Sequence, residues 1–212
     1  QFRHSKYKLN LDLPADWIVY IPLEEQNGRF QSDDYDKLLD APLTAGSFNI
    51  YQFYVNQHKH KFIIFGEWPR GLPDNFIENV KKTCEACCEI FNQAPPSGNK
   101  YTFILQLLEK AYGGLEHDNS TVIQFDWRTL HSPNGYRKLL QLIGHEYFHQ
   151  WNIRRLRPRE YVCYDYDQEV ICESLWFAEG ITSYFDLALP FIAGITNREQ
   201  LMSDLSHELS YV

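Results

Sequence analysis

The chain has 212 residues, of which 44% are hydrophobic and 16% aromatic, so it can bury a core and is not a disordered protein. Its formal net charge of −8 argues against nucleic acid or an anionic membrane as the main partner. No apolar run approaches the roughly 20 residues of a membrane span. The five cysteines lack disulfide spacing, which favours a cytoplasmic location and leaves a periplasmic one open.

The first part of the chain is predicted to be β-structure. Alternating, β-branched and aromatic residues predict four strands, at residues 9–13, 17–21, 48–55 and 61–65. The polar stretch 24–36 is predicted to be a loop. Gly66 and the Pro- and Gly-containing segment 68–73 then break the pattern. We therefore predict an N-terminal β-region over residues 1–70.

After residue 73 the apolar residues recur at helical spacing, which predicts a second domain over residues 71–212. Its predicted elements are a helix at 74–91 with Asp74 as N-cap, strands at 101–108 and 121–125, and helices at 134–151, 168–187 and from 197 to the end. Cys84, Cys87 and Cys88 lie at i, i+3 and i+4 of the first helix. We expect them to be small buried side chains; a metal site is the alternative, but a second ligand pair is missing.

The helix at 134–151, with Asn134 as its expected N-cap, carries His145-Glu146-Tyr147-Phe148-His149. Residues four apart on a helix point almost the same way, so His145 and His149 present two imidazoles to one point in space. Glu146 lies beside them. In zincins, two histidine nitrogens bind the metal and one carboxylate transfers protons. The alternative interpretation is a helix that carries two histidines beside its buried face without binding a metal.

A catalytic zinc site needs a third protein ligand, and Glu169, Glu173 and Glu179 follow on the next predicted helix. With Ile171 at the centre of the apolar stripe, Glu169 and Glu173 fall on the opposite face, which predicts solvated side chains. Glu179 flanks the stripe. We therefore predict His145, His149 and Glu179 as the ligands of Zn²⁺.

Three motifs in this order resemble the glycyl aminopeptidase family of gluzincin metallopeptidases. Residues 145–158, HEYFHQWNIRRLRP, carry the strongest likeness, and residues 176–184, WFAEGITSY, resemble the segment of the third ligand. Residues 113–117, GGLEH, resemble a Gly-x-Met-Glu-Asn exopeptidase motif, with Leu115 for Met and His117 for Asn. Residues 40–46 resemble the end of the family's N-terminal β-domain.

The resemblance implies an α+β fold: a thermolysin-like zincin catalytic domain preceded by part of an all-β N-terminal domain. It also implies a zinc aminopeptidase preferring small residues such as Gly or Ala, with Glu146 as general base and a peptide as substrate. Glu116 would bind the substrate's free ammonium, and Gly113 and Gly114 would let the substrate backbone approach. A C-terminal helical region and a PDZ module are expected in a longer protein.

Two other functions stay open at this stage. One is a zinc endopeptidase, if Glu116 does not bind an amino terminus; the other is a peptide-binding fragment without turnover. Ser183, Asp165 and Asp167 are candidates for orienting the metal-bound histidines. Tyr211 is a candidate for stabilising the oxyanion.

Overall fold

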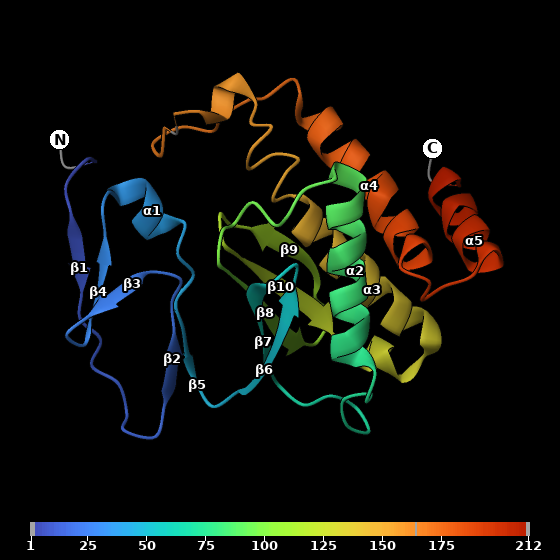
Figure 1. Cartoon of the computed structure of the whole chain (residues 1–212), viewed down its shortest axis with the longest axis horizontal. Coiled ribbons are helices and arrows are strands. Elements are labelled where there is room, and N and C mark those ends of the chain that lie inside the picture. Colours follow the sequence, from blue (N-terminus) through green and yellow to red (C-terminus); the bar gives the residue numbers. More distant parts are fainter. Residues whose placement is uncertain (1–2, 164, 211–212) are drawn as a thin grey trace.

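A computed structural model describes residues 3–163 and 165–210, and Figure 1 shows three parts in it. Short N-terminal strands lie at one side, a larger sheet lies in the centre, and long helices cover the sheet and extend to the C-terminal side. The mixture of sheets and helices confirms the α+β class predicted from the sequence.

The N-terminal part consists of two small sheets and one short helix. A three-stranded sheet has the order β1-β4-β3, and a two-stranded sheet pairs β2 with β5. The elements are β1 (Tyr7–Leu9), β2 (Ile18–Tyr20), β3 (Glu24–Gln26), β4 (Arg29–Ser32), α1 (Tyr35–Leu39) and β5 (Thr44–Gly46). The loop predicted at 24–36 is therefore wrong: Asn27 (φ +54°) and Gly28 (φ +72°) make a tight turn between two antiparallel strands.

The central sheet has five strands in the order β6-β7-β8-β10-β9. They are β6 (Asn49–Val55), β7 (His58–Phe65), β8 (Lys100–Leu108), β9 (Tyr112–Glu116) and β10 (Ser120–Asp126). β7, β8 and β10 run parallel, while β6 and β9 form antiparallel edges. The pairing of β7 with β8 corrects the assignment of residues 48–65 to the N-terminal β-region, because these strands continue the sheet of the second domain.

Helices α2 and α3 pack on one face of this sheet and enclose the main core. The helices are α2 (Phe76–Phe91), α3 (Pro133–Phe148), α4 (Leu175–Ile192) and α5 (Arg198–Leu209), with short 3₁₀ turns at Trp127–His131 and Arg159–Tyr161. Cys84, Cys87 and Cys88 are buried on α2, as expected of core side chains. None of the described helices has the length and apolar character that crossing a membrane requires.

Three helix starts differ from the sequence prediction. The N-cap of α2 is Asn75, not Asp74, and the N-cap of α3 is Ser132, whose hydroxyl accepts a hydrogen bond from the backbone N–H of Gly135. Pro133 occupies the first turn of α3, where a proline costs no hydrogen bond. Helix α4 begins at Leu175, seven residues later than predicted, because Ile171 is 80% exposed and gives the preceding segment no buried stripe.

A buried histidine lies directly beneath the helix that carries the His-Glu-x-x-His motif. His60 of β7 is fully buried, and its Nε2 lies 2.9 Å from the hydroxyl of Tyr147. Burial lowers the pKa of His60 to about 4 from its usual 6.5. The folded protein therefore keeps this ring neutral under conditions in which the unfolded chain protonates it.

This difference predicts a loss of stability in acid. Between pH 6.5 and pH 4 only the unfolded chain binds the proton, so the free energy of unfolding should fall by roughly 3 kcal/mol as the pH is lowered through this window. Urea denaturation of the wild type and His60→Gln at pH 7 and pH 4.5 measures the effect, with the exposed His131→Gln as control. An identical pH slope in wild type and His60→Gln would contradict it.

Candidate metal centre and peptide site

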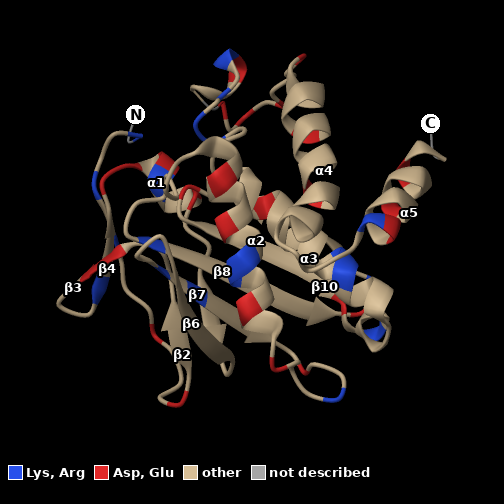
Figure 2. Ribbon diagram, turned by 45° about the vertical axis from the view of Figure 1, so that its right-hand side comes forward, with Lys and Arg blue, Asp and Glu red and all other residues tan. Residues whose placement is uncertain are grey.

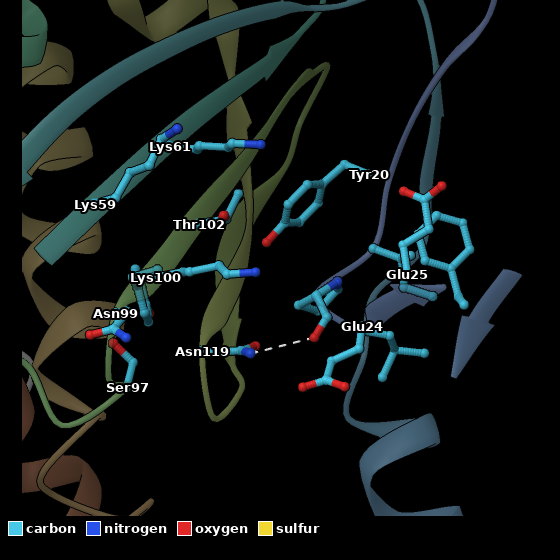
Figure 3. A pocket seen from close by; sticks show the side chains of 15 residues that line it. Tyr20, Glu24, Glu25, Lys59, Lys61, Ser97, Asn99, Lys100, Thr102 and Asn119 are labelled. Carbon is cyan, nitrogen blue, oxygen red and sulfur yellow. Dashed lines mark hydrogen bonds between the residues drawn. The ribbon is translucent and has the colours of Figure 1, made fainter. Parts of the chain in front are cut away.

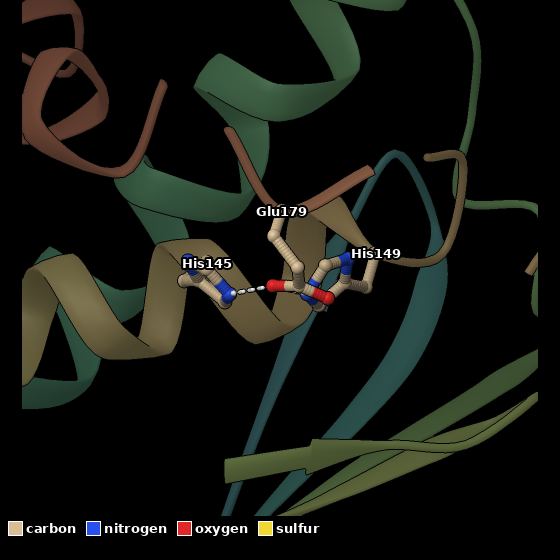
Figure 4. Close-up of side chains that lie close together, drawn as sticks. All are labelled: His145, His149 and Glu179. Atoms are coloured by element: carbon tan, nitrogen blue, oxygen red, sulfur yellow. Dashed lines mark ion pairs between the residues drawn. The ribbon is translucent and has the colours of Figure 1, made fainter. Parts of the chain in front are cut away.

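Two imidazoles and one carboxylate meet at a single point in the structure (Figure 4). His145 lies in the last turn of α3, and His149 directly follows as its C-cap, so the i, i+4 geometry holds. Nε2 of His145 lies 3.4 Å from a carboxylate oxygen of Glu179, and Nε2 of His149 lies 3.6 Å from the same oxygen. Glu179 comes from the second turn of α4.

Two of the distances between these donor atoms are close to those around a tetrahedral zinc ion. Ligands at about 2.0 to 2.1 Å from a tetrahedral centre lie about 3.3 to 3.4 Å apart. The two distances to Glu179 are close to that value, and all three ligand atoms lie within 4.8 Å of one another. Nitrogen and carboxylate donors also suit zinc chemically.

The other ring nitrogens are held by partners that orient the imidazoles. Nδ1 of His145 lies 2.9 Å from the carboxylate of Asp186, and Nδ1 of His149 lies 2.8 Å from the backbone carbonyl of Asn152. Each contact leaves Nε2 directed at the point where the two histidines and Glu179 meet. Ser183, Asp165 and Asp167 are exposed, so the sequence prediction of these orienting residues is wrong. Asp186 follows Glu179 by seven residues, two helical turns, and that spacing is the signal that was missed.

The charges of this cluster favour a bound cation. Burial lowers the pKa of His145, but its hydrogen bonds to Asp186 and Glu179 outweigh burial and raise the value to about 10. The same hydrogen bonds from His145 and His149 lower the pKa of Glu179. Two carboxylates thus stabilise positive charge at His145, where a zinc ion would bind.

Glu146 is buried between the predicted metal ligands and the sheet. Its carboxylate lies 3.4 Å from the hydroxyl of Thr121, and burial raises its pKa to about 7. A Cβ atom at Gly114 would lie 2.2 Å from Oε1 of Glu146, so only glycine leaves room for this carboxylate. Gly113 has φ +148°, a value that glycine adopts readily. The role of Gly113 and Gly114 in substrate approach stays a prediction. The structure shows another reason for glycine at position 114, which is the space that Glu146 occupies.

Glu116 ends strand β9 at the edge of the sheet, beside the metal ligands. It is half-buried. Burial lowers the pKa of His149, while the hydrogen bond to Glu179 and then the charge of Glu116 raise it; the same charge adds to the effect of burial in raising the pKa of Glu146. Among the described residues, no hydrogen bond or ion pair engages its carboxylate. Glu116 lines a pocket of about 330 Å³ that also includes Leu115 and Arg154. This carboxylate is therefore free to bind a ligand, although the lining of the pocket does not include His145, His149 or Glu179.

The turn after Glu116 is held by a residue from the N-terminal part. One carboxylate oxygen of Asp40 lies 2.9 Å from Arg154 and 3.3 Å from Nδ1 of His117, which is buried. The other oxygen accepts a hydrogen bond from the backbone N–H of Asp118 at 2.9 Å. Arg154 also pairs with Asp118 at 2.6 Å. This cluster fixes strand β9 relative to the segment that follows the His-Glu-x-x-His motif.

The other described residues considered as site residues in the sequence analysis do not lie in the cluster of His145, His149 and Glu179. Glu169 and Glu173 are exposed, as predicted for solvated side chains, although they precede α4 and do not lie on it. Tyr211 lies outside the described residues.

A helix bearing His-Glu-x-x-His above a mixed sheet, with a glutamate from the next long helix, defines the class of zinc metallopeptidases. Comparison with known proteins agrees. The family model described as M61 glycyl aminopeptidase matches residues 138–212, and the M61 N-terminal domain matches residues 1–47. The chain therefore belongs to the M61 glycyl aminopeptidase family. No curated protein sequence matches it.

Solved structures show the same likeness. An aminopeptidase N family protein from Idiomarina loihiensis is 32% identical, with a TM-score of 0.84 over 94% of this chain and 36% of that protein. A two-domain M1 zinc metallopeptidase, solved as an E323A mutant bound to L-arginine, is 15% identical, with a TM-score of 0.55 over 98% of this chain and 44% of that one. The second likeness concerns the fold alone. The chain spans about a third of the length of the first structure.

Proposed function

We propose that the intact protein is a zinc-dependent aminopeptidase that hydrolyses the first peptide bond of its substrate, with a preference for small N-terminal residues. The single observation that supports it most is the meeting of His145, His149 and Glu179 beside an unpaired carboxylate, Glu116. The first three are the metal ligands, and Glu116 distinguishes a free amino terminus from a peptide interior.

Zinc, when bound, supplies a Lewis acid that lowers the pKa of a water molecule to about 7 and polarises a carbonyl. Glu146 accepts the proton of the attacking water and passes it to the leaving amine. Burial raises the pKa of Glu146, and this favours the return of the proton to the leaving amine. Asp186 and the carbonyl of Asn152 keep the two imidazoles in the ligating orientation.

Glu116 sets the position of cleavage in this proposal. A charge-assisted pair with the substrate's ammonium forms only when the amino terminus is free. Beside a half-buried carboxylate the pair contributes about 2 to 4 kcal/mol, and an acetylated substrate would leave Glu116 unpaired.

The test compares alanyl and glycyl amides with their N-acetyl forms. We expect the wild-type enzyme to prefer the free amine by about 30- to 1,000-fold in kcat/KM, and Glu116→Gln to lose most of that preference. The exposed Glu67→Gln is the control and should keep it. Equal cleavage of both substrates by the wild type would reject the aminopeptidase and favour an endopeptidase. Metal binding without any turnover would favour a peptide-binding role.

Asp40 offers an independent test, because it holds the turn that follows Glu116. Asp40→Asn removes the charge that pairs with Arg154, and we expect KM for the free-amine substrate to rise about fivefold to tenfold with little change in kcat. Asp33→Asn is the matched control, since Asp33 forms only an exposed pair with Lys37. A fall in kcat at constant KM would show that Asp40 does not act through Glu116.

The cytoplasmic location and the C-terminal PDZ module stay predictions from the sequence and the family resemblance.

A further inference from the structure

Three lysines gather on the face of the central sheet that is turned away from the metal centre. Lys59 and Lys61 are two residues apart on β7, and Lys100 of β8 pairs in register with Lys59. Side chains two apart on a strand, and those directly opposite on the next strand, point to the same face. His60 and Tyr101 alternate with these lysines and point to the other face, where both contact Tyr147 of α3.

The lysines line a pocket of about 700 Å³, which lies within the usual size of small-molecule sites (Figure 3). Strands β7 and β8 form one wall, and the N-terminal segment 20–25 forms the other. A hydrogen bond of 3.4 Å from Asn119 to the carbonyl of Pro22 joins the two walls. In Figure 3 the side chains of Lys61 and Lys100 extend toward Tyr20, across the space between the walls. The cluster is therefore recessed between two parts of the chain.

No described carboxylate lies within ion-pair distance of these three lysines. Lys59, Lys61 and Lys100 form no ion pair among the described residues, although Glu24 and Glu25 line the pocket. The pKa of Lys61 is lowered by burial and then by the charges of Lys59 and Lys100. The protein as a whole has a formal net charge of −8, and Figure 2 shows Asp and Glu on α2, α4 and α5. Lys59 and Lys61 are half-buried and Lys100 is exposed, so the electrostatic cost of bringing the like charges together falls mainly on Lys61.

The pocket also offers neutral hydrogen-bonding groups. Asn99 and Asn119 supply amides, and Oγ of Ser97 is buried without a hydrogen-bond partner among the described residues. Tyr20 stands over the lysines, with Nζ of Lys61 5.6 Å from the centre of its ring. Several cationic donors, amides and a hydroxyl around one space are the groups that bind phosphate or carboxylate oxygens.

We propose that this pocket binds a compact anion carrying two or more negative charges, of the phosphate or carboxylate kind. The recess excludes a flat membrane surface, and three ammonium groups without an ion-paired carboxylate favour an anion with more than one charge. The site lies across the sheet from His145 and His149, so it is separate from the metal centre and does not depend on the proposed peptidase activity.

Calorimetric titration of the intact protein with pyrophosphate, citrate and acetate at equal ionic strength tests the proposal. We expect saturable one-to-one binding of pyrophosphate or citrate, and none of acetate at the same concentration. The tighter of the two multivalent anions identifies phosphate or carboxylate as the preferred group. Lys61→Met and Lys100→Met should each weaken binding at least tenfold, whereas Lys61→Arg should retain it within about threefold.

Lys138→Met is the matched control, because Lys138 is exposed on α3 and its loss changes the net charge equally. It should change affinity less than twofold. If Lys61→Met fails to fold in a thermal unfolding test, Lys100→Met decides, since Lys100 is exposed and tolerates substitution. Absence of saturable binding, or an equal loss in Lys138→Met, would overturn the proposal.

Discussion

Glu146→Gln is expected to keep the metal and lose turnover, with kcat falling by about 10²- to 10⁴-fold. The amide has nearly the same size as the carboxylate, so the contact with Thr121 and the space above Gly114 remain filled. It cannot accept a proton, however, and the attacking water and the leaving amine lose their proton carrier. Steady-state kinetics on an alanyl amide, with metal analysis of the same sample, measures both properties.

A matched variant separates this chemistry from a general effect of charge. Glu109→Gln removes an exposed carboxylate whose nearest described ion-pair partner is Arg128 at 3.9 Å, and it should leave kcat unchanged. Near-wild-type turnover by Glu146→Gln would show that another group carries the proton.

His149→Ala is expected to abolish metal binding. It removes one of three protein ligands, so zinc affinity should fall by more than about 100-fold, and activity should fall below detection. Asp186→Asn should have an intermediate effect, about 10- to 100-fold in affinity, because it weakens only the orientation of His145. The exposed His131→Ala is the control and should bind one metal ion.

Competition with a zinc chelator at pH 7 gives these affinities. A His149→Ala protein that still holds one tightly bound metal would show that the ligands lie elsewhere. Affinity should also fall as the pH is lowered, because the histidine ligands must release their protons before they bind zinc.

The structure brings together the three side chains that the sequence predicts as metal ligands, because the elements involved are local. The i, i+4 spacing of His145 and His149 needs only a helix, and Leu139, Leu140, Ile143 and Tyr147 make that helix certain by burying one face. Glu179 was chosen by the same helical geometry. The predicted position of Glu179 beside the buried face does not change although α4 begins at Leu175. The angle around the helix axis between Glu179 and the buried Ala178 and Thr182 is independent of where the helix begins.

Features that join distant parts of the chain could not be predicted in this way. The five-stranded sheet depends on pairing β7 with β8 across the whole of α2, and no local pattern distinguishes a strand of that sheet from a strand of the N-terminal part. Asp40 and His117 are 77 residues apart, and their contact exists only after both parts have folded. The lysine pocket arises from register between two parallel strands, which the alternation within each strand does not fix.

The most direct test of the account is an anomalous difference map at the zinc absorption edge, from crystals grown with one equivalent of zinc. The account predicts one strong peak about 2.0 to 2.2 Å from Nε2 of His145, Nε2 of His149 and a carboxylate oxygen of Glu179. A map without a peak at this point, or with the zinc held by other side chains, would contradict it.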